Sequence, residues 1–388
     1  MKHLYLILMG VLTLSCSGSN PEPEWFDRAV DVAHRQLLYQ VQQSNLVAGD
    51  RCFARSMADS SATYVNAYDW TSGFAPGNLW LGYELTGDTL LLGAARDYTD
   101  RLEQLQYYTG THDLGFMIFC SYGQAQRLAP RRGDTTIIIN GSRSLISRFD
   151  STICAIRSWD FGEWNYPVII DNMMNLEMLF WASRVSGDSL FARVATTHAN
   201  TTLKNHFRDD VTSYHVVSYN DDGSVESQGT NQGYSDSSPW ARGQAWGLYG
   251  YTTLYRFTGQ KKHLDLATAI AKYIMENAPS QSDLIPYWDY QAPLIPNEPR
   301  DASAAAITAS ALLELGGYVD RGDLYFDYAE RILRQLSSSD YLAPVGENCG
   351  FILQHSVGHR PAGSEVDVPL NYADYYFLEA LLRFKALR

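Results

Sequence analysis

The chain has 388 residues, and its 43 acidic residues outnumber its 30 basic ones, which gives a formal net charge of −13. This excess of acid argues against a basic nucleic-acid-binding surface, so we expect no nucleic-acid partner. Hydrophobic residues make up 45% of the chain, which excludes a disordered protein and fits a packed globular one. The 26 Tyr, 15 Phe and 9 Trp fit either a core or a sugar-binding cleft.

The N-terminal segment has the pattern of a secretory signal. Basic residues at 2–3 precede an apolar run at 4–14, and small residues follow at 15–18. The apolar run is too short to cross a bilayer, and no later segment is apolar enough to do so. The pattern therefore predicts export from a bacterial cytoplasm and no transmembrane span.

Cys16 follows the apolar run after Ser15 and resembles the cysteine of a bacterial lipobox, which receives a lipid anchor. Thr13 stands where a strict lipobox has Leu, so plain secretion is the alternative. We expect residues 1–16 to be the signal peptide, residues 17–24 a polar tether, and residues 25–388 one catalytic domain. The expected location is the periplasm or, as a lipoprotein, the membrane surface.

The remaining cysteines are widely spaced and form no CxxC pair, so they indicate neither a zinc ribbon nor a dense disulfide framework. Burial as free thiols is the favoured interpretation, and one disulfide is the alternative. These cysteines are Cys52, Cys120, Cys154 and Cys349.

Five glycine turns divide the chain into helical hairpins. At each turn an amphipathic stretch ends at a glycine, which favours the left-handed position after a helix, and a polar residue then caps the next helix. The turns are Thr86-Gly87-Asp88, Arg132-Gly133-Asp134, Ser186-Gly187-Asp188, Thr258-Gly259-Gln260 and Arg321-Gly322-Asp323.

Helical periodicity flanks these turns, for example at 262–277 and 324–337. One further helix is predicted at 25–41 and another at 372–387, which gives twelve in all. Twelve helices in six hairpins predict an all-α, single-domain (α/α)6 barrel, with short β segments such as 214–219 as decorations of its loops. An α-solenoid is the alternative, but its repeat lengths would be more regular.

Polar, aromatic and glycine-rich clusters precede or begin the six helices expected on the inside. Because inner helices of such a barrel run in the same direction, the clusters should meet at one mouth and line a pocket there. They are 70–74 (WTSGF), 112–116 (HDLGF), 171–175 (DNMMN), 240–246 (WARGQAW), 301–303 (DAS) and 367–369 (DVP).

Asp113 and Asp171 are the candidate acid and base of this pocket. Each could instead be a helix N-cap, which is the commoner role of an Asp at such a position. Two carboxylates that face one cavity can divide the roles of acid and base. A helix N-terminus favours the ionised form, whereas a neighbouring carboxylate or an apolar wall raises the pKa. Asn175, one turn after Asp171, is expected to hold the Asp171 side chain.

Arg242 lies in the first turn of its helix, where a cation opposes the helix dipole. This placement favours a role in gripping an anionic ligand. Trp246 follows four residues later on the same face, so we expect the guanidinium and the indole to form one platform.

The nine histidines show no metal-ligand spacing, and His112 and His215 taken alone are weak candidates. The sequence contains no nucleophile elbow, P-loop, dinucleotide fingerprint or zinc-protease helix. We therefore expect no metal and no cofactor.

The ordered clusters, with the tail at 364–370 and 374–376, resemble glycoside hydrolase family 88, the unsaturated glucuronyl hydrolases. The resemblance extends from about Trp25 to the C-terminus and covers all six expected inner helices in order. It implies an (α/α)6 barrel that removes a Δ4,5-unsaturated uronic acid from the non-reducing end of lyase-generated oligosaccharides. In this family a carboxylic acid protonates C4, water adds at C5, and the product opens and expels the aglycone.

The resemblance also implies roles for individual residues. Asp171 would be the general acid and base, and Asp113 its assisting carboxylate. Arg242 would take the uronate carboxylate. The remaining residues expected to contact the sugar or line its subsite are His215, Gln232, Trp246, His112 and Trp70.

The loop before the last helix helps this family to choose between sulfated and unsulfated substrates. Here Ser356, His359 and Arg360 are candidates for contact with the aglycone or a sulfate. Glycosaminoglycan fragments are the preferred expectation for the substrate.

Two alternatives stay open at this point. The first is an unsaturated rhamnogalacturonyl hydrolase, which has the same barrel and acts on pectin fragments. The second is a non-catalytic glycan-binding lipoprotein, which would need the aromatic pocket but not both Asp113 and Asp171.

Overall fold

A computed structural model describes residues 23–47 and 49–388 of the chain. The predicted signal peptide, Cys16 and most of the predicted tether lie outside the described residues. The predictions of export and of a lipid anchor therefore stay predictions.

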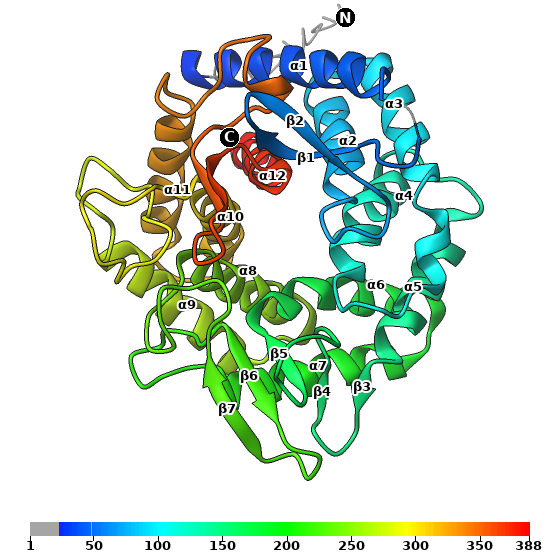
Figure 1. Cartoon of the computed structure of the whole chain (residues 1–388), viewed down its shortest axis with the longest axis vertical. Helices are drawn as coiled ribbons and strands as arrows, with labels where there is room; N and C mark the ends of the chain where they lie inside the picture. The colour runs from blue at the N-terminus through cyan, green and yellow to red at the C-terminus, as the bar shows by residue number, and fades with distance from the viewer. Residues whose placement is uncertain (1–22, 48) are drawn as a thin grey trace, which may run out of the picture.

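The described residues contain twelve α-helices in two concentric sets (Figure 1). The outer helices are α1 (Glu24–Ser44), α3 (Thr89–Asp100), α5 (Asp134–Ile146), α7 (Ser189–Asn205), α9 (Lys261–Glu276) and α11 (Gly322–Leu336). The inner helices are α2 (Phe74–Thr86), α4 (Gln124–Leu128), α6 (Leu176–Ser186), α8 (Ala241–Thr258), α10 (Ala302–Leu315) and α12 (Asn371–Ala386). A π-helix, η2 (Gly115–Gly123), leads into α4, and a 3-10 helix, η3 (Ile170–Asn175), leads into α6.

Residue patterns separate the two sets. The inner helix α10 is buried around nearly its whole circumference, and its many alanines allow close packing against neighbours. The outer helix α11 buries a single stripe that includes Ala329, Ile332 and Leu336. Along the inner set, α2 contacts η2, η2 contacts η3 and α6, α6 and η3 contact α8, α8 contacts α10, and α10 contacts α12. The last inner helix, α12, also contacts the first, α2.

Three of the five predicted turns have the expected geometry. Gly87, Gly187 and Gly259 have φ values of 73°, 76° and 62°, so each takes the left-handed position that ends a helix. The carboxylates of Asp88 and Asp188 accept backbone N–H bonds at the starts of α3 and α7, as predicted.

The prediction is wrong for Gly133 and Gly322, which have no left-handed backbone. Gly133 is already in the right-handed region as the N-cap of α5, because α4 ends five residues earlier in the chain, at Leu128. Gly322 is the first residue of α11, and a short 3-10 helix, η4 (Gly316–Tyr318), ends the preceding hairpin arm. A Cβ at Gly322 would lie 2.1 Å from the Gly316 carbonyl oxygen, so close packing requires this glycine.

Short antiparallel strands form four small sheets in the loops, as predicted. They are β1 (Phe53–Ala58) with β2 (Ser61–Val65), β3 (Phe149–Asp150) with β4 (Ala155–Ile156), β5 (Pro167–Ile169) with β6 (Val216–Tyr219) and β7 (Val225–Gly229), and β8 (Ser356–His359) with β9 (Ser364–Val368). In the three-stranded sheet, Val217 of the central strand lies opposite Val168 and Gln228.

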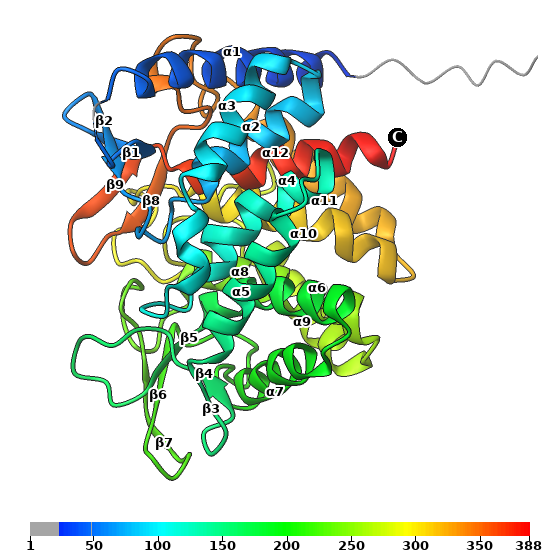
Figure 2. The ribbon, with the colours of Figure 1, turned by 90° about the vertical axis from the view of Figure 1, so that its right-hand side faces the viewer.

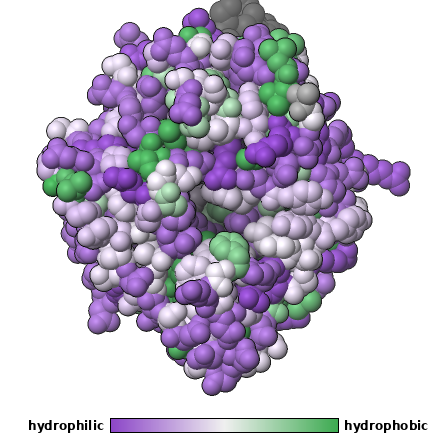
Figure 3. All heavy atoms as spheres, in the orientation of Figure 1, coloured by the Kyte–Doolittle hydropathy of each residue, from purple (hydrophilic) through white to green (hydrophobic). Residues whose placement is uncertain are grey.

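The strands gather toward one end of the helices, and the C-terminus of α12 lies at the opposite end (Figure 2). We call the first the strand end, where the inner helices begin, and the second the far end. The face of the strand end is hollowed at its centre (Figure 3).

The four cysteines among the described residues, Cys52, Cys120, Cys154 and Cys349, are all free, as expected, but only Cys52 and Cys120 are buried, and the expected burial is wrong for Cys154 and Cys349. Within the same part of the chain, no helix has the length and hydropathy needed to span a membrane.

Candidate active site

Aromatic side chains join the starts of the inner helices at the strand end. The ring centroid of Trp70, just before α2, lies 5.6 Å from that of Phe116 and 5.1 Å from that of Tyr372. Phe116 of η2 also lies 5.3 Å from Trp246 of α8, which contacts Tyr376 of α12 at the same distance. Segments predicted to meet at one mouth are therefore together in the structure.

Asp171 is the second residue of η3 and is buried. Its Oδ2 atom has no hydrogen-bond partner and lies 3.6 Å from Nε2 of His215. Burial is the main cause that raises the pKa of Asp171 to about 7; the charge of Arg242 acts against it and that of Asp113 adds to it. The carboxyl group thus holds a proton near neutral pH and has an oxygen left to offer a ligand.

His215 lies directly before β6, and its hydrogen bonds determine which ring nitrogen carries the proton. Its Nδ1 accepts the backbone N–H groups of Asn231 and Gln232, each at 3.1 Å. A nitrogen that accepts two bonds carries no proton, so the proton is on Nε2, the atom nearest to Asp171. Burial places the pKa of His215 well below its ordinary value, so the ring is neutral.

Asp113 lies before η2 with its side chain 16% exposed. The Thr111 hydroxyl donates to Oδ2 at 2.7 Å, and His112 Nε2 lies 3.2 Å from Oδ1. Burial raises the pKa of Asp113 to about 7, opposed by Thr111 and assisted by the charge of Asp69. Burial also lowers the pKa of His112 to about 3, so this neighbour is neutral.

The N-cap interpretation is wrong for both aspartates, because neither η2 nor η3 receives a side-chain cap. Asp301 provides the contrast, since its Oδ1 accepts the N–H groups of Ser303 and Ala304 at the start of α10. The carboxyl groups of Asp113 and Asp171 therefore do not cap a helix N-terminus.

The expectation that Asn175 holds Asp171 is also wrong. Asn175 Oδ1 accepts the backbone N–H of Phe116 at 3.0 Å, and Gly115 packs directly against the Asn175 Cα. The tight approach of η2 to η3 directs the amide toward the neighbouring helix, and it joins the two segments that carry the candidate acid and base.

Arg242 is buried, and protein acceptors occupy much of its guanidinium. Nη1 donates to the Val357 carbonyl and lies 3.3 Å from Asp301 Oδ2, and Nη2 donates to the Gly358 carbonyl at 2.7 Å. Nε has no partner. The N–H of Nε and the second N–H of Nη2 remain for a ligand, and these two point to the same side of the planar group.

The prediction that Arg242 and Trp246 form one platform is wrong, because the guanidinium packs against other aromatic rings. The guanidinium carbon lies 4.3 Å from the ring centroid of Trp240 and 5.3 Å from that of Tyr372. Trp246 instead packs its indole against Phe116, and its buried Nε1 has no hydrogen-bond partner. The carbonyl groups of Val357 and Gly358 hold the guanidinium, so it packs against Trp240 and Tyr372 rather than against its i+4 neighbour.

The loop before α12 is the β8–β9 hairpin. Gln232 Nε2 donates to the Gly358 carbonyl at 3.0 Å, so the predicted sugar contact is attached to this hairpin. Ser356 is buried with an unpartnered hydroxyl, and His359 is partly buried with a pKa lowered by burial and by Arg242. Arg360 is exposed at the hairpin turn.

Sequence reasoning missed four residues that orient these groups: Thr111, Trp240, Asp301 and Tyr372. Thr111 adjoins the cluster at 112–116, and Trp240 begins the cluster at 240–246 but had been given no role of its own. A hydroxyl two residues before an Asp is a local signal. Asp301 was noted only for its position before a helix, and its contact with Arg242 spans 59 residues. No group of three or more His, Cys, Asp or Glu within the described part of the chain is arranged to hold a metal ion.

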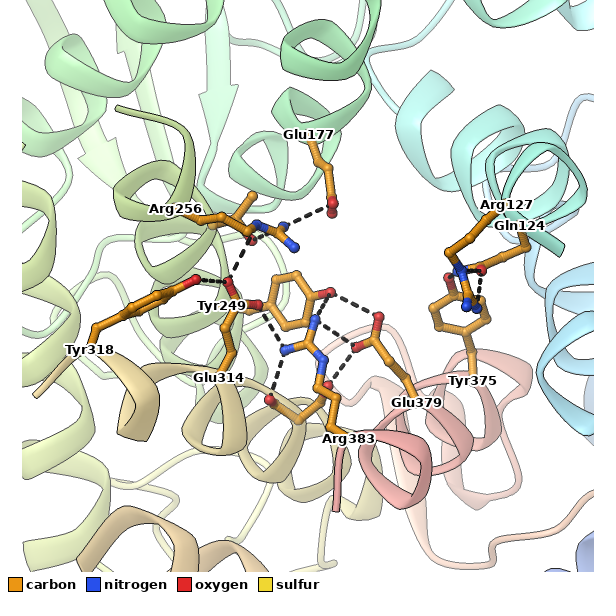
Figure 4. A network of polar contacts seen from close by, with 12 residues as sticks. Gln124, Arg127, Glu177, Tyr249, Arg256, Glu314, Tyr318, Tyr375, Glu379 and Arg383 are labelled. Atoms are coloured by element: carbon orange, nitrogen blue, oxygen red, sulfur yellow. Dashed lines mark hydrogen bonds and ion pairs between the residues drawn. The ribbon is translucent and has the colours of Figure 1, made fainter. Parts of the chain in front are cut away.

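A second polar site lies at the far end (Figure 4). A cavity of about 640 Å³ is lined there by Glu177, Glu379, Arg256 and Arg383, among others. Arg256 Nη2 lies 2.8 Å from Glu177 Oε1, and Arg383 Nη1 lies 3.0 Å from Oε2 of Glu314. Each of these carboxylates thus has a cationic partner.

Comparison with known proteins decides the family. No protein-family model matches the chain. The chain is 43% identical to an unsaturated glucuronyl hydrolase of Formosa agariphila, over 98% of both chains. It is 34% identical to an unsaturated glucuronyl hydrolase of Bacillus sp. strain GL1, over 85% of this chain and 90% of that one. The chain belongs to the unsaturated glucuronyl hydrolase family.

Solved structures of unsaturated glucuronyl hydrolases agree with this assignment. One that is specific for heparin matches with a TM-score of 0.90 and 47% identity, over 94% of this chain and 98% of its own. The Bacillus sp. GL1 enzyme matches with a TM-score of 0.85 and 28% identity, over 93% and 97%. The resemblance to glycoside hydrolase family 88 is confirmed, and the chain is a glycoside hydrolase. The pectin-directed and non-catalytic alternatives are therefore set aside.

Proposed function

We propose that the strand end of this unsaturated glucuronyl hydrolase protonates C4 of a Δ4,5-unsaturated uronic acid, with Asp171 as the proton donor. One observation carries the proposal. Asp171 is buried beside a neutral His215, has an oxygen without a partner, and has a pKa raised to about 7. A general acid that works near neutral pH needs this combination of an unoccupied oxygen and a retained proton.

We further propose that the six hairpins close into an (α/α)6 barrel. The contacts between successive inner helices, and the contact of α12 with α2, support a closed ring. A closed ring directs all six inner-helix starts to one mouth, where the aromatic and carboxyl side chains can surround one sugar.

The proposed reaction begins with transfer of the Asp171 proton to C4, as the electron pair of the C4–C5 double bond forms the new C–H bond. The resulting cation at C5 is stabilised by the ring oxygen. Water adds to C5 and gives a proton back to the Asp171 carboxylate, which restores the acid. The hemiketal then opens to a ketone at C5, and the hemiacetal left at C1 releases the aglycone with its oxygen.

Asp113 assists in this scheme through its charge. Two carboxyl groups that repel each other do not both ionise readily, so the pair retains one proton near neutral pH. The hydroxyl of Thr111 donates to Asp113 and supports its ionised form. That arrangement leaves the shared proton on Asp171, the more deeply buried of the two.

Binding of the uronate is assigned to the remaining predicted residues. The free N–H groups of Arg242 form a two-pronged donor for the substrate carboxylate. His215 and Gln232 contact the sugar, and Trp246 shapes the subsite. His112 and Trp70 line its wall.

Glycosaminoglycan fragments, and heparin-derived disaccharides in particular, are the proposed substrates. The support comes from relatives, since the heparin-specific structure is 47% identical to this chain. A Streptococcus agalactiae enzyme solved with dGlcA-GalNAc6S is 27% identical, and a chondroitin disaccharide hydrolase of Streptococcus pneumoniae is 31% identical. Ser356, His359 and Arg360 are the proposed contacts for the aglycone or its sulfate.

Export and anchoring at Cys16 complete the proposal. A Cys16→Ser variant should move from the membrane fraction to the soluble periplasmic fraction, and an unchanged distribution would contradict the anchor.

The test of function is incubation with unsaturated disaccharides made by lyases from heparin and from chondroitin, followed through the loss of the enoate absorbance. We expect turnover of both types of disaccharide, with the higher kcat/KM for the heparin type. The saturated glucuronide should not be cleaved, because it has no double bond at C4. Absence of turnover with every unsaturated disaccharide, or cleavage of the saturated one at a similar rate, would overturn the proposal.

A further inference from the structure

A three-way ion contact outside the substrate residues joins two walls of the strand end. Arg55 on β1 donates from Nε to Glu365 Oε1 at 2.6 Å and from Nη2 to Oε2 at 2.9 Å. Its Nη1 donates to Asp69 Oδ2 at 2.7 Å. The three side chains are only 15–24% exposed, so solvent screens these contacts less than it would on an open surface.

On one side, Asp69 fixes the turn that carries Trp70. Its Oδ1 accepts the backbone N–H of Thr71 at 2.9 Å and the Thr71 hydroxyl at 2.6 Å. Arg55 holds the other oxygen of the same carboxylate. The position of the Trp70 indole is therefore linked to the guanidinium of Arg55.

On the other side, Glu365 packs against the peptide that holds Arg242. A Cβ at Gly358 would lie 2.4 Å from Glu365 Oε2, so the two are in direct contact. The Gly358 carbonyl accepts from both Arg242 Nη2 and Gln232 Nε2. Glu365 has a φ of 53°, an unusual value for a residue with a side chain, and its ion pair with Arg55 holds it there.

We propose that Arg55 is a positioning residue that ties the Trp70 wall to the β8–β9 hairpin and so fixes the uronate-binding groups of Arg242 and Gln232. This inference rests on the proposed roles of Trp70, Arg242 and Gln232 in binding the sugar. Arg55 itself contacts none of the candidate acid and base groups through a hydrogen bond or ion pair among the described residues.

The hairpin keeps other attachments when Arg55 is changed, so the variants should fold. Ser56 donates to the Pro369 carbonyl at 2.7 Å and forms a bridge with Leu370. What the variants lose is the orientation of groups that bind the ground state and the transition state alike. Such a loss raises KM with little change in kcat.

The experiment compares Arg55→Lys, Arg55→Ala and Glu365→Gln with the wild type on one unsaturated disaccharide, with thermal unfolding measured alongside. Arg55→Lys keeps the charge but loses the fork, so it should behave like Arg55→Ala rather than like the wild type. We expect KM to rise about 3- to 10-fold and kcat to stay within about 2-fold. The double variant Arg55→Ala/Glu365→Gln should have a KM no higher than that of the more strongly affected single variant, because both changes break the same ion pair.

The matched control is Arg127→Ala at the far end, because Arg127 forms the same kind of two-pronged contact, with Nη1 2.6 Å from Glu84 Oε1. Its KM should equal that of the wild type. An unchanged KM in the Arg55 and Glu365 variants would overturn the inference. So would a fall in kcat with no change in KM, if the fall equals the fraction of protein that is unfolded. If the wild type itself turned over no unsaturated disaccharide, the proposed function would fail instead, so the two failures are distinguishable.

Discussion

The two ends of the inner helices carry carboxylates and arginines in different arrangements. At the far end, Glu177, Glu314 and Glu379 lie within ion-pair distance of Arg256 or Arg383 (Figure 4). At the strand end, neither Asp113 nor Asp171 has an Arg or Lys partner among the described residues, and the nearest bases are neutral histidines.

This difference separates two uses of a buried carboxyl group. Burial raises the pKa of Glu177 as well, but the charge of Arg256 acts directly against it. Burial prevails over the charge of the arginine at both sites, but Arg256 lies 2.8 Å from Glu177, whereas Arg242 is engaged by Asp301 and by two carbonyls and forms no ion pair with Asp171. We therefore expect the paired carboxylates of the far end to serve stability, and the unpaired Asp171 of the strand end to keep a transferable proton.

The largest expected effect comes from replacing one carboxyl group at each end by an amide. Asp171→Asn should lower kcat by roughly 10²–10⁴-fold, the usual size of a lost proton-transfer group, and should keep the fold because Asp171 caps no helix. Glu177→Gln should leave kcat within about 2-fold of the wild type, since it only weakens an ion pair. Steady-state kinetics on one unsaturated disaccharide measures both. A near-normal kcat for Asp171→Asn would remove Asp171 from the mechanism.

Stability should respond in the opposite way. Arg383→Met should lower the free energy of unfolding by about 2–4 kcal/mol, because it leaves the partly buried Glu379 without its cationic partner and Glu314 with only Arg256. Lys261→Met is the matched control, since the Lys261–Asp265 pair is exposed and should contribute less than about 1 kcal/mol. Denaturant unfolding measures both changes, and kcat should be unaffected in each. Equal losses of stability would mean that burial of the far network does not matter.

A smaller effect is expected for the uronate-binding arginine. Arg242→Lys should lower kcat/KM by about tenfold or more, because lysine keeps the charge but not the planar fork. Methyl esterification of the substrate carboxylate should then harm the wild type much more than the variant. Equal harm to both would show that Arg242 serves another partner.

The smallest effect concerns pH. If protonated Asp171 is the active form, kcat/KM falls as pH rises through its pKa, which is about 7. The charge of Asp113 raises that pKa, so Asp113→Asn should move this basic limb to lower pH, by on the order of one unit. The residual activity of the variant, measured from pH 5 to 9 (a range of about two units on either side of that pKa), tests the shift. A limb that stays in place or moves to higher pH would contradict the coupling of the two carboxyl groups.

Local signals in the sequence were enough to predict much of the fold. The helix predicted at 262–277 is α9 (Lys261–Glu276), and Gly87 and Gly187 end their helices as expected. Gly322 misled the prediction because its role is a close tertiary contact with Gly316, which no local pattern records.

The candidate site was predictable as a set of residues but not as a set of contacts. The clusters predicted that Asp113 and Asp171 lie at one mouth. The aromatic contacts that join these clusters are present in the structure. The partners of Arg242 come from Val357 and Gly358, more than 100 residues away, so the sequence offered only its i+4 neighbour. The tautomer of His215 likewise depends on backbone N–H groups of the loop after β7, 16 and 17 residues along the chain, which no local pattern records.

The position of hydrogen in the product tests the central claim most directly. In D₂O, the Asp171 carboxyl group carries deuterium and, in this account, delivers it to C4 of the unsaturated sugar. NMR of the product at early times, before exchange next to the new ketone, should therefore show one deuterium at C4, on a single face. A product that carries no deuterium at C4 at early times would contradict protonation of the double bond, and with it the role of Asp171.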